Sequence, residues 1–200
     1  MQRLIVAWSL AGAAVLAGCA SAPIGSSAGT PADPRTAPQL RLAPALLGRA
    51  VNLQQHLTLQ AQGHDQQLDV LLEADAHHVQ MGVVAMGQVA ARLDWDGVTL
   101  TENRATWWPP AVSGSRILSD LQLTLWPVTA IQSALPAGWR LVEDGNVRTL
   151  SQDGAAVTVI TRLSPLVVEL DQRREHFKLK IESRDLGNET QSQPPSLATP

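Results

Sequence analysis

Few side chains in this 200-residue sequence have the type and spacing needed for catalysis or metal binding. Two adjacent histidines, His77 and His78, come closest, but neighbouring residues on a strand point to opposite faces, so the pair alone makes a poor metal site. The other histidines, His56, His64 and His176, are scattered over expected polar faces and turns. The sequence has no His-Glu-x-x-His pair and no phosphate-binding loop. We therefore expect no enzyme activity, no metal and no noncovalent cofactor, with a hydrolase as the least favoured alternative.

The only cysteine, Cys19, points to covalent lipid attachment. After Arg3, an uncharged apolar run spans Leu4 to Ala17; these fourteen residues are too few to cross a membrane, which takes about 20, but they suit a signal peptide. Leu16-Ala17-Gly18-Cys19 resembles a bacterial lipobox, where cleavage before the cysteine is coupled to its acylation. We predict a signal peptide over 1–18 and a diacylglycerol plus an N-acyl chain on Cys19. The alternative is ordinary cleavage near Ala-x-Ala, with Cys19 an incidental thiol.

The lipobox resemblance also implies a location. One acyl chain anchors a protein only marginally, at about 0.8 kcal/mol per buried methylene, but the three chains of a mature bacterial lipoprotein anchor it nearly permanently. Ala20 and Ser21 lack the aspartate that retains many enterobacterial lipoproteins at the inner membrane. We therefore expect an outer-membrane protein facing the periplasm, with outer-membrane lipids among its partners.

Composition narrows the function classes. Removing residues 1–18 takes away one charged side chain, Arg3, and leaves 14 basic against 18 acidic residues, a net charge of −4. A mildly acidic chain lacks the basic footprint of a nucleic-acid-binding protein, so we expect no nucleic-acid partner. With one cysteine there is no internal disulfide, and a single core of about 140 residues must supply the stability.

The chain divides into four parts. After the signal peptide, residues 19–45 are rich in Ala, Pro, Ser, Gly and Thr and show no period, so we expect a lipidated cysteine and a flexible tether. Residues 46–183 carry the folded domain. Residues 184–200, polar and Pro-containing, are typical of a disordered tail.

The folded part alternates apolar and polar residues, as half-buried antiparallel strands do. Asp-Gly pairs mark several hairpin turns. Between the strands, residues 117–125 and 127–135 favour two short helices, although Leu121, Leu123 and Leu125 also fit a strand. We predict a mainly β (α+β) fold, a strongly curved antiparallel half-barrel of about ten strands whose concave face is covered by a short helical insert. The expected strands lie near 51–61, 68–74, 79–83, 89–95, 98–102, 139–143, 147–151, 155–162, 167–170 and 177–181.

Two stretches carry a family resemblance that covers roughly residues 46 to 183. They are "LQQHLTLQAQGHDQQLDVLLEADAHHVQMGVVAMGQVAARLDWDG" and "ILSDLQLTLWPVTAIQSALPAGWRL", with a recognisable "MG" after two strands and a Leu-Trp-Pro. They resemble a family of uncharacterised bacterial lipoproteins, domain of unknown function 3261, and more distantly the outer-membrane lipoprotein receptor LolB. The resemblance implies a half-barrel with an apolar cavity for a lipid, an aryl-polyene-type pigment lipid or the acyl chains of a lipoprotein.

Two sets of candidate residues follow. In LolB-like proteins an apolar loop between the third and fourth strands contacts the client or membrane, and the matching stretch here breaks the strand alternation; a bulge or burial on both faces is the alternative. The adjacent indoles Trp107 and Trp108 cannot both enter one core, so one is expected at a cavity mouth or headgroup level, or partly exposed at a strand end. The candidate contact residues are Val83, Val84, Met86, Trp107 and Trp108. The candidate cavity residues are Leu57, Leu72, Met81, Leu93, Leu121 and Trp126.

These features favour a binding and transfer protein. We expect an outer-membrane-anchored lipoprotein that holds a hydrophobic ligand or lipoprotein client in an apolar half-barrel, receives it from a periplasmic donor protein, and transfers or inserts it. The alternative is a non-catalytic structural lipoprotein of an envelope assembly, with its sheet filled by its own side chains. An apolar internal space distinguishes the two.

Overall fold

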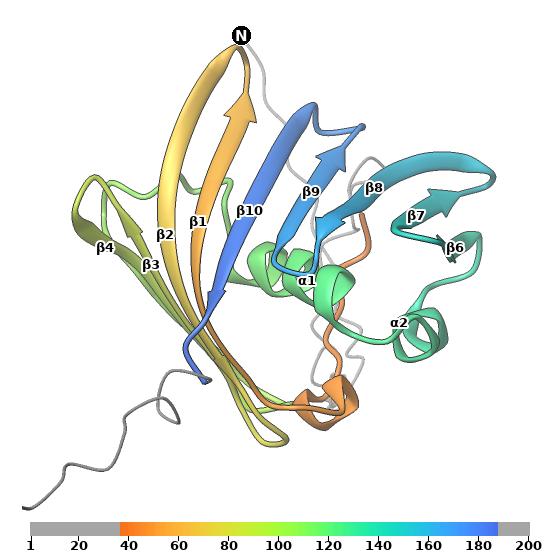
Figure 1. Ribbon diagram of the computed structural model, residues 1–200, viewed down its shortest axis with the longest axis horizontal. Helices are drawn as coiled ribbons and strands as arrows, with labels where there is room; N and C mark the ends of the chain where they lie inside the picture. Colours follow the sequence, from red (N-terminus) through yellow and green to blue (C-terminus); the bar gives the residue numbers. More distant parts are fainter. Residues whose placement is uncertain (1–36, 188–200) are drawn as a thin grey trace, which may run out of the picture. The chain divides into compact units, whose positions relative to one another are not determined.

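The computed structural model describes residues 37–187. The expected signal peptide, Cys19 and most of the expected tether and tail lie outside the described residues. Ten strands, two α-helices and one 3-10 helix make up this part (Figure 1). In chain order they are η1 (Pro44–Leu47), β1 (Val51–Ala61), β2 (His64–Ala74), β3 (Val79–Ala85), β4 (Gln88–Trp95), β5 (Leu100–Arg104), α1 (Gly114–Leu125), α2 (Val128–Ala134), β6 (Trp139–Asp144), β7 (Val147–Gln152), β8 (Ala155–Ser164), β9 (Val167–Gln172) and β10 (Phe177–Asp185).

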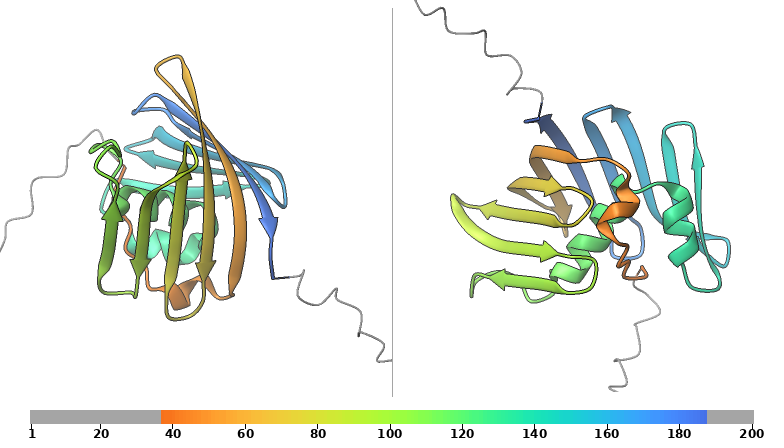
Figure 2. Two further views of the ribbon diagram at one scale, coloured as in Figure 1. Left: turned by 90° about the vertical axis from the view of Figure 1, so that its left-hand side faces the viewer. Right: turned by 90° about the horizontal axis from the view of Figure 1, so that it is seen from below.

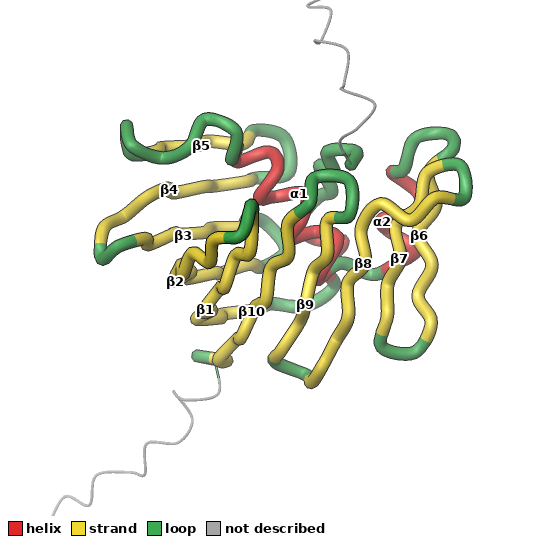
Figure 3. The backbone as a smooth tube through the Cα atoms, turned by 90° about the horizontal axis from the view of Figure 1, so that it is seen from above, coloured by secondary structure: helices red, strands yellow, loops and turns green. Residues whose placement is uncertain are grey.

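All ten strands form one antiparallel sheet that does not close. The order is β5-β4-β3-β2-β1-β10-β9-β8-β7-β6, so each strand pairs with its sequence neighbour except at one place, where β1 pairs with β10. The two free edges therefore fall in the middle of the chain, at β5 and β6. The helices lie between those edges in sequence, and α1 lies inside the curve of the sheet (Figures 2 and 3). This confirms the expected mainly β, ten-stranded open sheet with a helical insert.

Short turns join the strands, as the sequence predicts. Met86 and Gly87 both have positive φ, 51° and 73°, and connect β3 to β4 as a two-residue hairpin turn. The turn before β5 is longer than expected, because the Asp96 carboxylate accepts hydrogen bonds from the backbone N–H groups of Val98 and Thr99, at 2.7 and 2.6 Å. These bonds lower the pKa of Asp96. Val98, expected in the strand, lies in this turn with 84% of its surface exposed.

Helix α1 settles the ambiguity over residues 117–125 in favour of a helix. Ser113 is its N-cap and accepts a hydrogen bond from the backbone N–H of Arg116. The strand alternative would place Leu121, Leu123 and Leu125 on one face, whereas in the helix Leu123 is fully buried and the other two are half-buried. Pro127 then precedes α2, where its missing N–H costs no hydrogen bond.

A segment before β1, residues 37–47, packs along α1, and we call it the strap. Its apolar side chains Leu40, Leu42 and Leu47 are 2–5% exposed and belong to the core. The Pro/Ala-rich sequence of residues 37–45 has no period and predicts a flexible tether. They are instead part of the fold, because hydrogen bonds from side chains replace the missing secondary structure. At the other end, β10 continues to Asp185, two residues into the expected tail.

Buried polar side chains of α1 hold the strap. The amide of Gln122, 0% exposed, accepts from the Leu42 N–H at 3.0 Å and donates to the Leu42 carbonyl at 2.9 Å. The Trp95 indole N–H donates to the same carbonyl at 2.8 Å. Ser119 accepts from the Leu40 N–H at 3.1 Å. Each bond satisfies a backbone group that burial would otherwise leave unpaired.

We predict that Gln122→Ala destabilises the fold by about 2–3 kcal/mol, because it leaves the buried Leu42 N–H without a partner and opens a small cavity. Chemical denaturation measures this change. The matched control is Ser115→Ala, which loses only the exposed hydrogen bond from Arg41 and should cost under about 0.5 kcal/mol. Equal losses in the two variants would contradict a strap held by Gln122.

Candidate functional site

Helix α1 crosses the concave face with its N-terminal end fixed to β5. A carboxylate oxygen of Glu102 accepts a hydrogen bond from the Gly114 N–H at 2.9 Å, and a negative charge is favourable at this end of a helix. The approach requires glycine, because a Cβ on Gly114 would lie 2.6 Å from a methyl carbon of Leu93. One edge strand of the open sheet thus holds the start of the helix.

The C-terminal end of α1 is fixed by arginines from the other half of the sheet. Arg148 on β7 donates to the carbonyls of Leu123, Thr124 and Trp126, at 3.1, 3.3 and 2.8 Å. Arg162 on β8 donates to the Thr124 carbonyl at 3.2 Å. Positive charge at the last turn complements the helix dipole, so the two ends of α1 are matched by charges of opposite sign.

One carboxylate lies between these arginines. Glu143 on β6 forms an ion pair with Arg148 and approaches Arg162 at 3.5 Å. The hydrogen bond from Arg148 is the main reason that the pKa of Glu143 is lowered. The pKa of Arg162 is also lowered, first by burial and then by the neighbouring charges of Arg148 and Arg49. We call Arg49, Arg148 and Arg162 the arginine cluster.

A second polar network joins the middle of α1 to β8 and β9. Arg116 binds Asp120 at 2.8 Å and also Glu175. Asp120 in turn accepts a hydrogen bond from Gln172 at 2.9 Å, and Gln172 accepts one from Thr158 at 2.7 Å. Burial raises the pKa of Asp120, against the opposing effect of Arg116. The network fixes α1 above one half of the sheet and leaves the space beyond its C-terminal turn unfilled.

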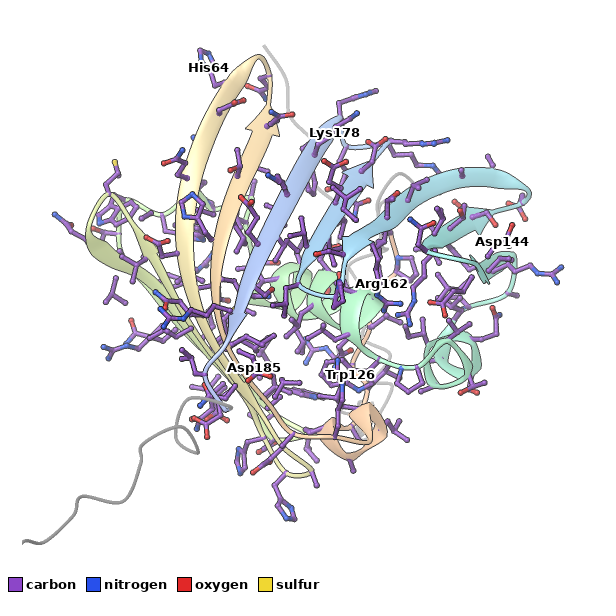
Figure 4. All side chains as sticks on the ribbon, in the orientation of Figure 1. His64, Trp126, Asp144, Arg162, Lys178 and Asp185 are labelled. Carbon is purple, nitrogen blue, oxygen red and sulfur yellow. The ribbon has the colours of Figure 1, made fainter. Side chains whose placement is uncertain are left out.

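That space is a cleft of about 530 Å³ on the concave side of the sheet, between the inner faces of β1, β9 and β10 and the end of α1. Its floor carries the half-buried apolar side chains Val51, Leu53, Leu125, Val168 and Ile181, together with the polar Gln55 and Ser183, whose side chains are hydrogen-bonded to each other at 3.0 Å. Charged side chains stand around the floor. Figure 4 shows Arg162 beside the end of α1 and Asp185 at the end of β10. The charged lining residues are Arg49, Glu73, Asp75, Arg162 and Asp185.

The six candidate cavity residues do not line this cleft. Four of them are packed in the core at 0–9% exposure: Leu72, Met81, Leu93 and Trp126. The other two, Leu57 and Leu121, are half-buried and pack against the core. Leu57 follows Gln55, a lining residue, on the same face of β1, and Leu121 lies one helical turn before Leu125. The structure thus brings two of the six close to the cleft.

The candidate contact residues of the β3–β4 hairpin divide between core and tip. Val83 is buried, Val84 is half-buried and Met86, at the turn, is 83% exposed. The pairing shifts after Val83, so that Ala90 and Ala91 of β4 are both buried and form a bulge. The bulge lies in β4, whereas β3 alternates regularly, so the half-buried Val84 is on the face opposite Val83 and Ala85, and Met86 projects at the tip.

The two adjacent indoles also separate. Trp108 is 8% exposed and its N–H donates to the Val112 carbonyl at 3.0 Å. Trp107 is 40% exposed and meets Trp108 edge to face, with ring centroids 6.2 Å apart. One indole thus closes the loop before α1, and the other is available at the surface.

Sequence reasoning missed the arginine cluster, although two of its members carry a signal. In β7 and β8, Arg148 and Arg162 occupy the same strand face as the buried Leu150 and Ile160. A charged residue at a core-facing position requires a partner, which here is the end of α1. Arg49, which follows the left-handed Gly48, carries no such signal.

The described part of the chain offers no metal centre. No group of three or more His, Cys, Asp or Glu side chains within residues 37–187 is placed to hold a metal ion. His77 and His78 belong to a turn in which their backbone N–H groups donate to Asp75, at 2.7 and 2.8 Å, and these bonds lower the pKa of Asp75. Among the described helices, none has the length and apolar character needed to span a membrane.

The fold is an open antiparallel half-barrel with a helix lying across its concave face. A family model described as "Protein of unknown function (DUF3261)" matches residues 52–185, which include all ten strands in whole or nearly so. The chain belongs to this family. No curated protein matches the chain.

We predict that Glu143→Gln makes stability less dependent on pH in the acid range. Because the pKa of Glu143 is lowered from 4.5 in the fold, its carboxylate stabilises the protein above that pH, and the contribution is lost as the pH falls through the lower, folded value. Denaturation at neutral pH and at pH values below 4.5 should show a smaller acid loss in the variant, by up to about 1 kcal/mol. Asp144→Asn, which removes a charge from the adjacent exposed turn, is the control. An unchanged acid loss in Glu143→Gln would contradict the assignment.

Proposed function

We propose that the protein is an outer-membrane-anchored periplasmic lipoprotein that binds the hydrocarbon part of a lipid or lipidated client in the cleft and transfers or inserts it into the membrane. The observation that carries this proposal is the set of apolar side chains on the concave face that the protein's own helix leaves half-exposed. An inward-facing apolar surface that remains uncovered favours binding of an apolar ligand, because removing apolar surface from water is favourable by about 25 cal/mol per Å².

The size and shape of the cleft suit such a client. Its volume of about 530 Å³ lies within the range of about 300–1,000 Å³ that is typical of small-molecule sites. The cleft opens at the end of α1 and is lined by strands that are held in register by long ladders, so a chain can enter without unfolding the sheet. A client shielded in a half-barrel is also what the sequence resemblance to LolB implies.

The exposed tip of the β3–β4 hairpin supports contact with a bilayer or client. Met86 is flexible and apolar, and its backbone in the left-handed region directs it away from the core. Trp107 offers an amphipathic ring of the kind favoured at lipid headgroups.

The structural alternative rests on a different observation. Between α1 and the half of the sheet formed by β2, β3 and β4, the interior is filled by the protein's own side chains, among them the fully buried Trp126 and Leu72. A scaffold protein needs such a solid interior and no ligand. Occupancy of the cleft therefore separates the two functions.

We predict that Leu53→Trp blocks the cleft. An indole at this inward-facing position of β1 fills the space above the floor, so lipid that copurifies with the protein from gently extracted membranes should fall at least fivefold by native mass spectrometry. The matched control is Gln54→Trp, which adds the same indole to the convex face of the same strand. Absence of lipid from the unaltered protein, or equal lipid occupancy in the two variants, would contradict the proposed carrier function.

The anchor gives a separate prediction. Cys19→Ser removes the acylation site that the sequence predicts, so the protein should leave the outer-membrane fraction, and the mass of its N-terminal peptide should lack the acyl chains. Val98→Ser, a change at an exposed turn, serves as the control and should stay with the membrane. Unaltered membrane association of Cys19→Ser would refute the lipid anchor.

A further inference from the structure

The charges around the cleft are separated by sign. Arg49 and Arg162 stand on the side of the strap and β8, whereas Asp75 and Asp185 stand at the ends of β2 and β10. A polar group of a ligand lying on the apolar floor would therefore meet guanidinium groups on one side and carboxylates on the other.

The carboxylates are already engaged with the backbone. Asp75 accepts hydrogen bonds from two N–H groups of its own turn, and Asp185 accepts one from the Gly187 N–H at 2.8 Å. These local bonds give both carboxylates hydrogen-bond partners without a ligand. The acidic side thus has much of its hydrogen-bonding capacity satisfied.

The arginine side is under-neutralised. Arg148 and Arg162 share one carboxylate, that of Glu143. The N–H groups of Arg148 donate to this carboxylate and to the last carbonyls of α1. Within residues 37–187, Arg49 has no hydrogen bond or ion pair to a protein group. The pKa of Arg162 is lowered first by burial and then by the positive charges of Arg148 and Arg49, which lie near enough to act on it.

We propose that the cleft selects amphiphiles with an anionic group, a phosphate or a carboxylate, which binds between Arg49 and Arg162 while the hydrocarbon chain lies over Leu53, Val168 and Ile181. Guanidinium groups present several N–H donors in a plane and bind such anions with strong, charge-assisted hydrogen bonds. This inference rests on the proposed function and adds the chemical class of the ligand to it.

Calorimetry with the full-length protein in lipid nanodiscs tests this inference, with empty nanodiscs subtracting partition into the bilayer. The probes share a twelve-carbon chain and differ in the head: dodecyl phosphate, dodecanoate, dodecanol and dodecylamine, each as monomer. Inorganic phosphate, without a chain, is the fifth probe. We expect dodecyl phosphate and dodecanoate to bind about tenfold or more tightly than dodecanol, with dodecylamine and inorganic phosphate weaker still.

Variants assign the preference to the arginines. Arg49→Gln, which breaks no contact within the described residues, should weaken the binding of dodecyl phosphate about three- to tenfold and leave the affinity for dodecanol unchanged. Arg162→Gln should do the same, with its folding checked by thermal unfolding because it also loses the bond to Thr124. The control is Arg140→Gln, an exposed arginine of β6 that does not line the cleft and should change neither affinity.

The outcomes distinguish this inference from the function on which it rests. Equal affinity for the four dodecyl probes, tightest binding of dodecylamine, or an unaffected Arg49→Gln variant would overturn the anionic preference while leaving a cleft that binds hydrocarbon. Inorganic phosphate binding as tightly as dodecyl phosphate would overturn the amphiphile as ligand. Failure of every dodecyl probe to bind would refute the proposed function itself.

Discussion

Helix α1 is held at its two ends by charges of opposite sign that come from opposite sides of an open sheet. Glu102 of β5 accepts a hydrogen bond from the first N–H, that of Gly114, and Arg148 and Arg162 of β7 and β8 donate to the last carbonyls. Because β5 is one edge of the sheet and β7 is next to the other, the helix bridges the opening. The helix dipole makes both attachments favourable, and reversing the helix would make both unfavourable. The orientation of α1 in turn fixes the strap, the filled half of the interior and the cleft.

The open sheet and the cleft have a common cause. Pairing of β1 with β10 brings the ends of the domain together and leaves the edges at the middle of the chain, where the helical insert begins and ends. The twelve residues of α1 lie across the concave face, and the Arg116–Asp120 network and the strap pack along its length. Beyond its last turn the inner faces of β1, β9 and β10 remain half-exposed. An uncovered apolar surface with guanidinium groups beside it is suited to an amphiphile.

The local structure could be predicted from the sequence, and the long-range contacts could not. Alternation along β1 and the turn residues at Asp144-Gly145 predict strands and hairpins because both signals are local. Pairing of β1 with β10 has no such signal, since it joins residues more than a hundred positions apart. The strap was missed because side-chain hydrogen bonds from Gln122 fix it, and no period reports them. The cleft was missed because its charged wall, Arg49 and Arg162, forms only when the end of α1 meets β8.

The most direct measurement is photo-crosslinking of the full-length protein in isolated cell membranes with a dodecyl phosphate that carries a diazirine at the end of its chain, followed by peptide mapping. If hydrocarbon occupies the cleft, crosslinks concentrate on its floor, in the peptides that contain Leu53, Leu125, Val168 and Ile181. Crosslinks confined to the convex face of the sheet, or spread evenly over exposed residues, would contradict the account.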